Sequence, residues 1–141
     1  MARTDEVRMA RLIVLDASAL IALYSSRDVH HGWAIDLFMK TVDSELVIPA
    51  LTFAEVLVRP IQVGKRNEFQ RSIEKLGLRV LPLDAGASVE LATLRASTSL
   101  KMPDAVVLQS AQATRAALAT TDLKLAMAAR ERGVPVFAPA N

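Results

Sequence analysis

The sequence predicts an α/β fold: a three-layer sandwich in which helices flank a short, mostly parallel central sheet. Short apolar runs alternate with helical segments along the chain, which is typical of parallel sheets built from strand–helix–strand units. The first run, residues 12–15, is continuously apolar, the pattern of a strand buried on both faces. Hydrophobic residues make up 52% of the chain and aromatic residues only 4%, so aliphatic side chains supply the core of such a sheet.

The first elements follow from apolar spacing and from helix-breaking residues. After the first strand, Asp16 opens a short helix that runs to residue 23. Residues 30–42 show helical spacing, with Trp33, Leu37 and Phe38 on one side. The next expected elements are a strand over residues 46–48 that ends at Pro49 and a helix over residues 52–58 that stops near Pro60.

The second half continues the alternation of helix and strand. In order, we expect a polar helix over residues 64–76 closed by Gly77, a strand over 79–81, a helix over 84–97, a helix with Pro103 in its first turn, a strand over 118–120, a helix over 122–132 ended by Gly133, and a last strand over 135–137. Right-handed crossovers then align the carboxyl ends of the strands along one edge, where ligands bind in such sheets.

The length of 141 residues fits one domain, with a polar leader over residues 1–10 and a single domain over residues 11–141. The chain has 17 basic and 15 acidic residues, and this near-neutral balance does not indicate a polybasic nucleic-acid binder. Because cysteine is absent, disulfides, thiolate metal ligands and cysteine nucleophiles are excluded. The aliphatic excess leaves apolar surface for a homodimer or a bound partner.

We expect no targeting signal at the start of the chain. No apolar run approaches the roughly 18 residues that a membrane span requires. Basic residues precede the first apolar run, as in a signal peptide, but Asp5 and Glu6 lie in the would-be charged region, and Asp16 and Ser18 interrupt the apolar part. We therefore expect an unexported, cytoplasmic protein.

Four carboxylates point to a metal site. Asp16 and Asp122 each follow a predicted strand, so both belong at the carboxyl edge of the sheet. Asp104 lies in the first turn of a helix after Pro103, and Glu55 lies within an apolar helical segment, where an ionised group is costly unless it is paired or binds a metal. Carboxylates with few basic residues nearby are typical oxygen ligands of Mg²⁺ or Mn²⁺.

Each acid also has a structural interpretation. Asp16 and Asp122 fit helix N-caps, Asp104 fits a helix dipole, and Glu55 fits an ion pair with Arg59 one turn later. These interpretations do not explain why the acids share one predicted edge. Clustered carboxylates that hold one or two divalent ions support hydrolysis of a phosphodiester, because the ions activate a water and stabilise charge on the phosphate.

Four segments resemble the motifs of one family. In chain order they are residues 12–20 (LIVLDASAL), 54–60 (AEVLVRP), 102–105 (MPDA) and 120–122 (TTD). By their order and intervals, the chain from Leu12 onward resembles the PIN-domain ribonucleases. Its length and composition are most similar to the VapC-type toxins of prokaryotic toxin–antitoxin pairs.

The resemblance implies a PIN fold, RNA cleavage dependent on Mg²⁺ or Mn²⁺, and neutralisation by a cognate antitoxin. Carried over residue by residue, it implies four residues that are both catalytic and metal-binding: Asp16, Glu55, Asp104 and Asp122. Ser18 and Thr120 would orient these ligands. The last motif departs from many relatives, which have Phe where this chain has Leu125; a leucine can fill the same apolar site.

Other residues are less specific. His30 and His31 are expected to start a helix rather than to share a ligand, because adjacent helical residues point about 100° apart. Lys65, Arg66 and Arg71 are candidates for an RNA-backbone contact, although such a stretch is usually a solvated helix face.

Two alternative functions are open. A phosphotransfer receiver and a haloacid-type phosphatase also place an Asp after the first strand. The phosphatase pattern requires a second Asp where this chain has Ser18. A receiver has an acidic pair near the first strand and a Lys after a late strand, and neither is evident here. A non-catalytic PIN-like interaction module would be expected to lack one or more of the four acids.

Overall fold

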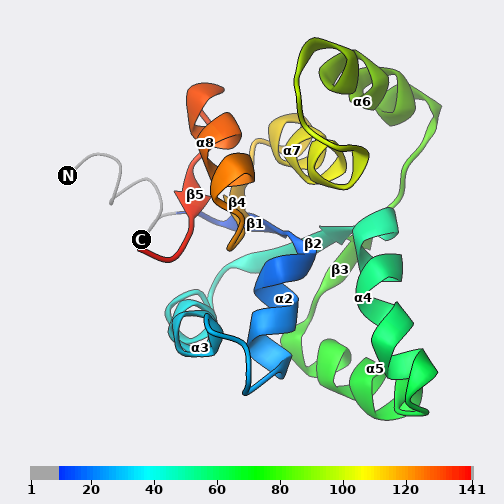
Figure 1. Ribbon diagram of the computed structural model, residues 1–141, viewed down its shortest axis with the longest axis vertical. Helices are drawn as coiled ribbons and strands as arrows, with labels where there is room; N and C mark the ends of the chain where they lie inside the picture. Colours follow the sequence, from blue (N-terminus) through cyan, green and yellow to red (C-terminus); the bar gives the residue numbers. More distant parts are fainter. Residues whose placement is uncertain (1–9, 141) are drawn as a thin grey trace.

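The computed structural model describes residues 10–140 and shows a five-stranded, all-parallel sheet between two layers of helices (Figure 1). The strand order is β3-β2-β1-β4-β5, which places the first strand in the centre. The strands are β1 (Leu12–Leu15), β2 (Glu45–Pro49), β3 (Arg79–Leu81), β4 (Ala117–Ala119) and β5 (Val136–Phe137). The predicted three-layer α/β sandwich is therefore confirmed.

Helices connect successive strands and cover both faces of the sheet. They are α2 (Ala17–Tyr24), α3 (His31–Lys40), α4 (Ala50–Gln62), α5 (Arg66–Leu76), α6 (Ala85–Ser97), α7 (Met102–Thr114) and α8 (Leu123–Glu131). Figure 1 shows α6, α7 and α8 on one side of the sheet and α2, α3 and α5 on the other.

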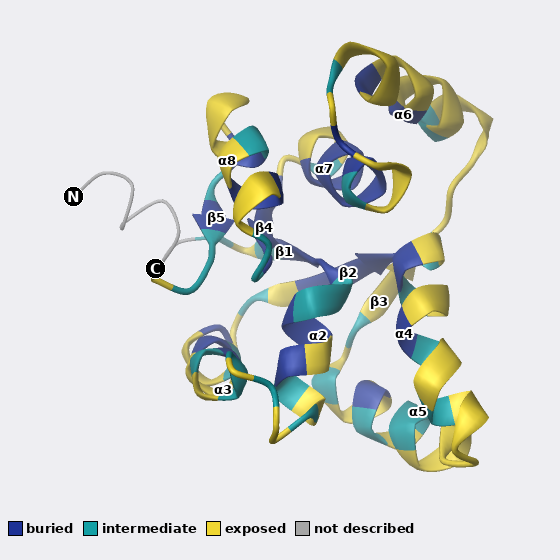
Figure 2. Ribbon diagram, viewed as in Figure 1, coloured by how far each residue is buried: buried dark blue, intermediate teal, exposed yellow. Residues whose placement is uncertain are grey.

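Successive side chains of β1 pack into two hydrophobic cores, one on each face of the sheet. Val14 packs in the cluster formed with α6, α7 and α8, whereas Ile13 and Leu15 pack in the cluster formed with α2, α3 and α5. All three side chains have an exposed fraction of 0% (Figure 2). The prediction that this apolar run forms a strand buried on both faces is confirmed, and the residue that follows it is held rigidly by both cores.

Helix α7 is the most enclosed of the helices. All seven residues from Ala105 to Ala111 are buried, because α7 packs on the sheet and is covered by α6 and α8. Pro103 lies in the first turn, where its missing N–H costs no helical hydrogen bond. Asp104, one position before the buried stretch, is therefore fixed at the exposed start of an element that cannot shift without disturbing the core.

Some element boundaries differ from those predicted. Helix α4 begins at Ala50 and continues through Pro60 to Gln62, whereas we expected it to stop near Pro60. Pro60 lies in the last turn, so it removes only one hydrogen bond close to the end of the helix. Strand β4 is shifted one residue toward the N-terminus, so Thr120 follows the strand instead of ending it.

The predicted leader, residues 1–10, lies outside the described residues except for Ala10. Ala10 packs against the core cluster on the α2 side of the sheet, and its carbonyl oxygen accepts a hydrogen bond of 2.8 Å from Ser44 Oγ. Within residues 10–140, none of the helices is both long and apolar enough to cross a membrane.

Candidate active site

The sheet topology brings the segments after β1 and β4 together. These two strands are parallel neighbours, with Leu15 in register with Ala119. The backbone N–H of Asp16 donates to the carbonyl oxygen of Ala119 at 2.9 Å, so the pairing extends one residue beyond β1. Asp16 and Asp122, which are 106 positions apart in the sequence, therefore share the carboxyl edge of the sheet, as predicted.

The carboxylate of Asp16 is held by three hydrogen bonds. The residue is buried, with an exposed fraction of 8%. Its Oδ1 accepts from the backbone N–H of Ala17 at 2.9 Å. Its Oδ2 accepts from Ser18 Oγ and from Thr120 Oγ1, each at 2.7 Å. Hydrogen bonds to a carboxylate are short and strong, so this side chain has one fixed orientation.

The two hydroxyl groups that hold Asp16 also fasten the loop after β4. Ser18 Oγ accepts from the backbone N–H of Thr121 at 3.0 Å, and Thr120 Oγ1 accepts from the backbone N–H of Asp122 at 3.0 Å. Each hydroxyl thus donates once to the carboxylate and accepts once from the backbone. Ser18 and Thr120 link the end of β1 to the start of α8 in one network, which is the contact expected of residues that orient a ligand.

Asp122 has the helix-capping role that we weighed for it. Its Oδ1 accepts from the backbone N–H of Leu125 at 3.1 Å, at the start of α8. This bond uses one of its two carboxylate oxygens. Leu125 is fully buried in the core under α8, so leucine does fill the apolar site that we expected it to fill.

The charges of neighbouring acids act on Asp104 and on Glu55. Burial raises the pKa of Asp104, and the negative charges of Asp122, Asp16 and Glu55 raise it further, while Lys124 opposes them. Although most of the Glu55 side chain is exposed, partial desolvation of its carboxyl group raises its pKa, and the charge of Asp16 adds to this shift. Four chain segments therefore contribute negative charge to one region, as the sequence predicted.

One expectation about Glu55 is wrong, and the ion pair that we considered as its structural interpretation is not formed. Glu55 is exposed, whereas its apolar sequence neighbours suggested a buried position. The reason is the helical periodicity of α4, which turns Val56 into the core and leaves Glu55 on the outer side. The structure shows no ion pair between Glu55 and Arg59, although both residues are described.

The donor set fits a hard divalent cation, but it is not assembled as a closed cage. The donors are all oxygen atoms, which Mg²⁺ and Mn²⁺ prefer. In residues 10–140, no three His, Cys, Asp or Glu side chains are arranged to hold one ion jointly. Mg²⁺ commonly keeps several waters and takes only one or two protein carboxylates, so this open arrangement suits Mg²⁺ better than an ion that requires a full protein cage.

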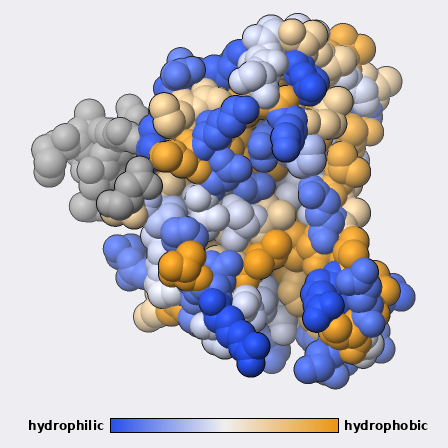
Figure 3. Space-filling view, in the orientation of Figure 1, coloured by the Kyte–Doolittle hydropathy of each residue, from blue (hydrophilic) through white to orange (hydrophobic). Residues whose placement is uncertain are grey.

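The predicted RNA-binding residues lie on and beside α5. Lys65 lines a groove of about 640 Å³ between α2, α4 and α5, together with Glu55. We call this the apolar groove, because Leu20, Val56 and Phe69 also line it. Figure 3 shows apolar side chains on the face where α2 and α4 lie.

Arg66 and Arg71 lie further along α5. Arg66 Nε donates to Gln70 Oε1 at 3.2 Å, and both arginines are exposed. His31 starts α3, as expected, and its Nδ1 lies 2.8 Å from the carbonyl oxygen of Ala22.

Sequence reasoning missed Lys124. This residue lies in the first turn of α8, and its ammonium is the cation that acts on Asp104. Its Nζ donates to the carbonyl oxygen of Ser99 at 3.3 Å. The sequence did contain a signal for this residue: Lys124 stands two positions after Asp122, an acid at the end of a strand. The first turn of the helix that follows a strand faces the same edge of the sheet as the end of that strand.

These features define an α/β domain with an acidic site at the carboxyl edge of a parallel sheet. The model of the PIN domain matches residues 13–131, and the chain belongs to the PIN domain family. No curated protein sequence matches the chain.

Three solved structures illustrate the similarity of fold. A toxin–antitoxin complex from Klebsiella pneumoniae contains a chain with 23% identity and a TM-score of 0.73, over 92% of this chain and 98% of that one. VapC20 of Mycobacterium tuberculosis, a toxin that cleaves the sarcin–ricin loop, has 16% identity and a TM-score of 0.69, over 82% and 94%. VapBC2 of Rickettsia felis, bound to a DNA fragment from its promoter, has 15% identity and a TM-score of 0.68, over 92% and 99%.

Proposed function

We propose that this protein is a VapC-type toxin: a metal-dependent endoribonuclease, and so a hydrolase, that is neutralised by a cognate antitoxin. The observation that carries the proposal is the fixed position of Asp16 and Asp122 at the carboxyl edge of the sheet, where Thr120 links them, together with the negative charge that Asp16 adds at Glu55 and Asp104. Similarity to a toxin that cleaves RNA supports RNA as the substrate class. We further propose that the protein acts in the cytoplasm as a homodimer, with residues 11–141 as its single domain.

Different residues of the chain would bind the metal ion and orient its ligands. Asp16 would hold Mg²⁺ or Mn²⁺ through the oxygen lone pairs that its three hydrogen bonds leave free. Ser18 and Thr120 keep that carboxylate in one orientation. Asp122 offers the oxygen that does not cap α8. When bound, the ion supplies an activated water and neutralises charge on the phosphate.

The raised pKa values of Glu55 and Asp104 are consistent with metal binding. Like charges that repel one another without a counter-ion favour either a proton or a cation. A divalent ion relieves the repulsion that raises the two pKa values, so ion and proton compete for the same carboxylates. The apparent metal affinity should therefore fall as the pH falls.

The apolar groove supports the antitoxin partner. Complexes of similar fold contain antitoxins, and an apolar groove of about 640 Å³ is suited to the apolar face of a peptide segment. Glu55 lines this groove, so a segment bound there would lie against the acidic site and obstruct it. We propose that Lys65, at the border of this groove, and Arg66 and Arg71 beyond it contact the RNA backbone.

The test is cleavage of RNA by the purified protein with Mg²⁺ or Mn²⁺, with and without a chelator. We expect Asp16→Asn and Asp104→Asn to lose cleavage by 100-fold or more, on the order of other removals of charged groups from reacting centres. The matched control is Asp36→Asn, since Asp36 is an exposed acid of α3 that pairs with Lys40. Equal cleavage by the wild type and the two site variants, or full cleavage in chelator, would contradict the proposal.

A non-catalytic PIN-like interaction module is the second candidate. The capping bond of Asp122 and the absence of a preassembled three-ligand set within residues 10–140 favour it. It predicts tight binding of an antitoxin with no cleavage of RNA under any divalent ion.

A further inference from the structure

A second groove lies on the other side of the sheet from the apolar groove. It encloses about 620 Å³ between α8 and residues 97–100, which lead into α7. We call it the α8 groove. Lys124, Met127 and Arg132 line it from the α8 side, and Ser97 and Ser99 line it from the opposite side.

One face of α8 forms the wall of this groove. The lining positions follow two adjacent rows at a spacing of four residues: Leu123, Met127 and Glu131 in one row, and Lys124, Ala128 and Arg132 in the other. The opposite face of the helix carries the buried residues that pack into the core. Leu123 and Met127 are about half exposed, at 51% and 52%. The wall therefore presents apolar surface between two cations.

One end of the α8 groove adjoins the acidic site. Leu123 and Lys124 line the groove and directly follow Asp122, the N-cap of α8. Lys124 Nζ makes one hydrogen bond, of 3.3 Å, to an exposed backbone carbonyl at Ser99. An ammonium group has three N–H donors, so this weak contact leaves donors for a further acceptor. Lys124 is thus held at the point where the groove meets the carboxylates.

The charge of the α8 groove differs from that of the apolar groove. In the apolar groove, the cations Arg59 and Lys65 are balanced by Glu55 and Glu68. The lining of the α8 groove holds Lys124 and Arg132 against a single acid, Glu131. An RNA strand that reaches four carboxylates meets repulsion, and fixed cations beside those carboxylates offset it.

We propose that the α8 groove binds the single-stranded RNA on one side of the cleaved bond, with Lys124 on the phosphate nearest the carboxylates and Arg132 on a phosphate further along. The rise of a helix places these two positions about 12 Å apart along α8. Leu123 and Met127 contact the sugar and base between them. The inference rests on the proposed function, since it names the path of that function's substrate.

The experiment measures binding rather than cleavage. Fluorescence anisotropy with a labelled single-stranded RNA in chelator gives the affinity over a range of salt concentrations. Each phosphate contact to a single strand contributes about 0.7 to the slope of log K against log salt. We expect Lys124→Gln and Arg132→Gln each to lower the slope by about that amount, and the double variant to lower it by about twice as much. Glu131→Gln should strengthen binding.

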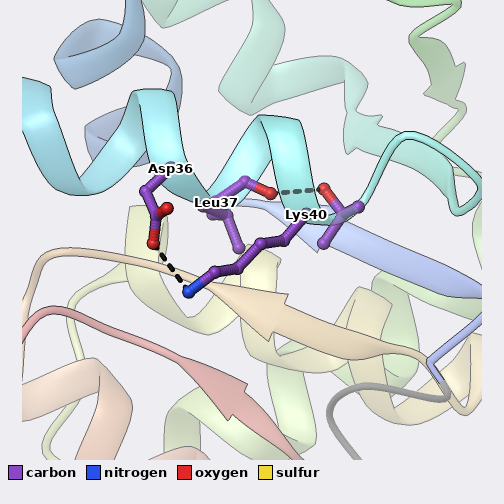
Figure 4. Close-up of polar contacts among 4 residues, drawn as sticks. Asp36, Leu37 and Lys40 are labelled. Atoms are coloured by element: carbon purple, nitrogen blue, oxygen red, sulfur yellow. Dashed lines mark hydrogen bonds and ion pairs between the residues drawn. The ribbon is translucent and has the colours of Figure 1, made fainter.

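The matched control is Lys40→Gln. Lys40 is exposed, pairs with Asp36 at 2.8 Å, and lies on α3, across the sheet from α8 (Figures 1 and 4). The Lys40→Gln variant loses the same charge at a position outside the groove, so its slope of log K against log salt should equal that of the wild type. Figure 4 also shows the neighbouring bond in which the carbonyl oxygen of Leu37 accepts from Thr41.

The outcomes separate the inference from the proposed function. Unchanged slopes in both groove variants, or no binding of RNA by the wild type, would overturn the inference. Loss of antitoxin affinity in these variants with unchanged RNA slopes would also overturn it, because the groove would then bind protein. Reduced slopes in a protein that cleaves no RNA would support the inference and contradict the proposed function.

Discussion

Three buried threonines form a graded series that tests the hydrogen-bond network around Asp16. Thr52, Thr41 and Thr120 have exposed fractions of 1%, 8% and 0%. Thr52 Oγ1 has no hydrogen-bond partner. Thr41 Oγ1 donates once, to the carbonyl oxygen of Leu37 at 2.8 Å. Thr120 Oγ1 donates to the Asp16 carboxylate at 2.7 Å and accepts from the N–H of Asp122 at 3.0 Å.

Replacement of each threonine by valine keeps the shape and removes the hydroxyl group. The Thr52→Val variant should be as stable as the wild type or more stable, because an unpaired buried hydroxyl is replaced by a methyl group. Thr41→Val should lose about 1 kcal/mol, the net contribution of one neutral hydrogen bond. Thr120→Val should lose about 3 kcal/mol, since one of its two hydrogen bonds is to a charged group, which is worth about 1.5–3 kcal/mol alone.

Urea unfolding in chelator, followed by circular dichroism, measures these differences, provided that the m-value is unchanged among the four proteins. The reasoning is refuted if Thr120→Val costs no more than Thr41→Val, or if Thr52→Val is the most destabilised of the three. The first result would mean that the Asp16 network contributes nothing beyond ordinary hydrogen bonds.

Three further predictions concern charge, metal and backbone. In the folded state, the pKa values of Glu55 and Asp104 lie above the ordinary values of 4.5 and 3.8. The metal-free protein should therefore lose stability as the pH rises through the ordinary values and then through the raised ones. Asp104→Asn should make this loss smaller, as measured by urea titrations at several pH values. Mg²⁺ at 100 times its Kd should stabilise the wild type by about 2.7 kcal/mol in thermal unfolding, and Asp16→Asn should abolish the effect. Gly77 and Arg115 each end a helix with a positive φ, of 68° and 56°, and this backbone conformation favours glycine. Gly77→Ala should therefore lower the stability by about 1 kcal/mol, and Arg115→Gly should raise it by about 1 kcal/mol.

The order and type of the elements were predictable from the sequence. Continuous apolar runs such as that of β1 identify strands buried on both faces, and Gly77 identifies the end of α5. The positions of Asp16 and Asp122 at the sheet edge followed from parallel topology alone. These signals are local, so a single sequence carries them.

Other contacts between distant segments were not predictable. The exposure of Glu55 depends on how α4 is rotated against the sheet, which neighbouring apolar residues do not fix. The influence of Lys124 on Asp104 depends on how the starts of α7 and α8 converge. Pro60 within α4 shows that tertiary packing can carry a helix past a residue that usually ends one.

The hydrogen bond from Thr120 to Asp16 joins residues 104 positions apart, and it has a consequence for synthesis of the protein on the ribosome. A nascent chain acquires Asp16, Glu55 and Asp104 early, but the third hydrogen bond to the Asp16 carboxylate forms only when Thr120 has been added and β4 has inserted beside β1. Truncated translation products that end before β4 therefore carry three of the four acids without the assembled site. The complete set of four acids, and any activity that requires it, therefore arises only when the message has been read almost to its end.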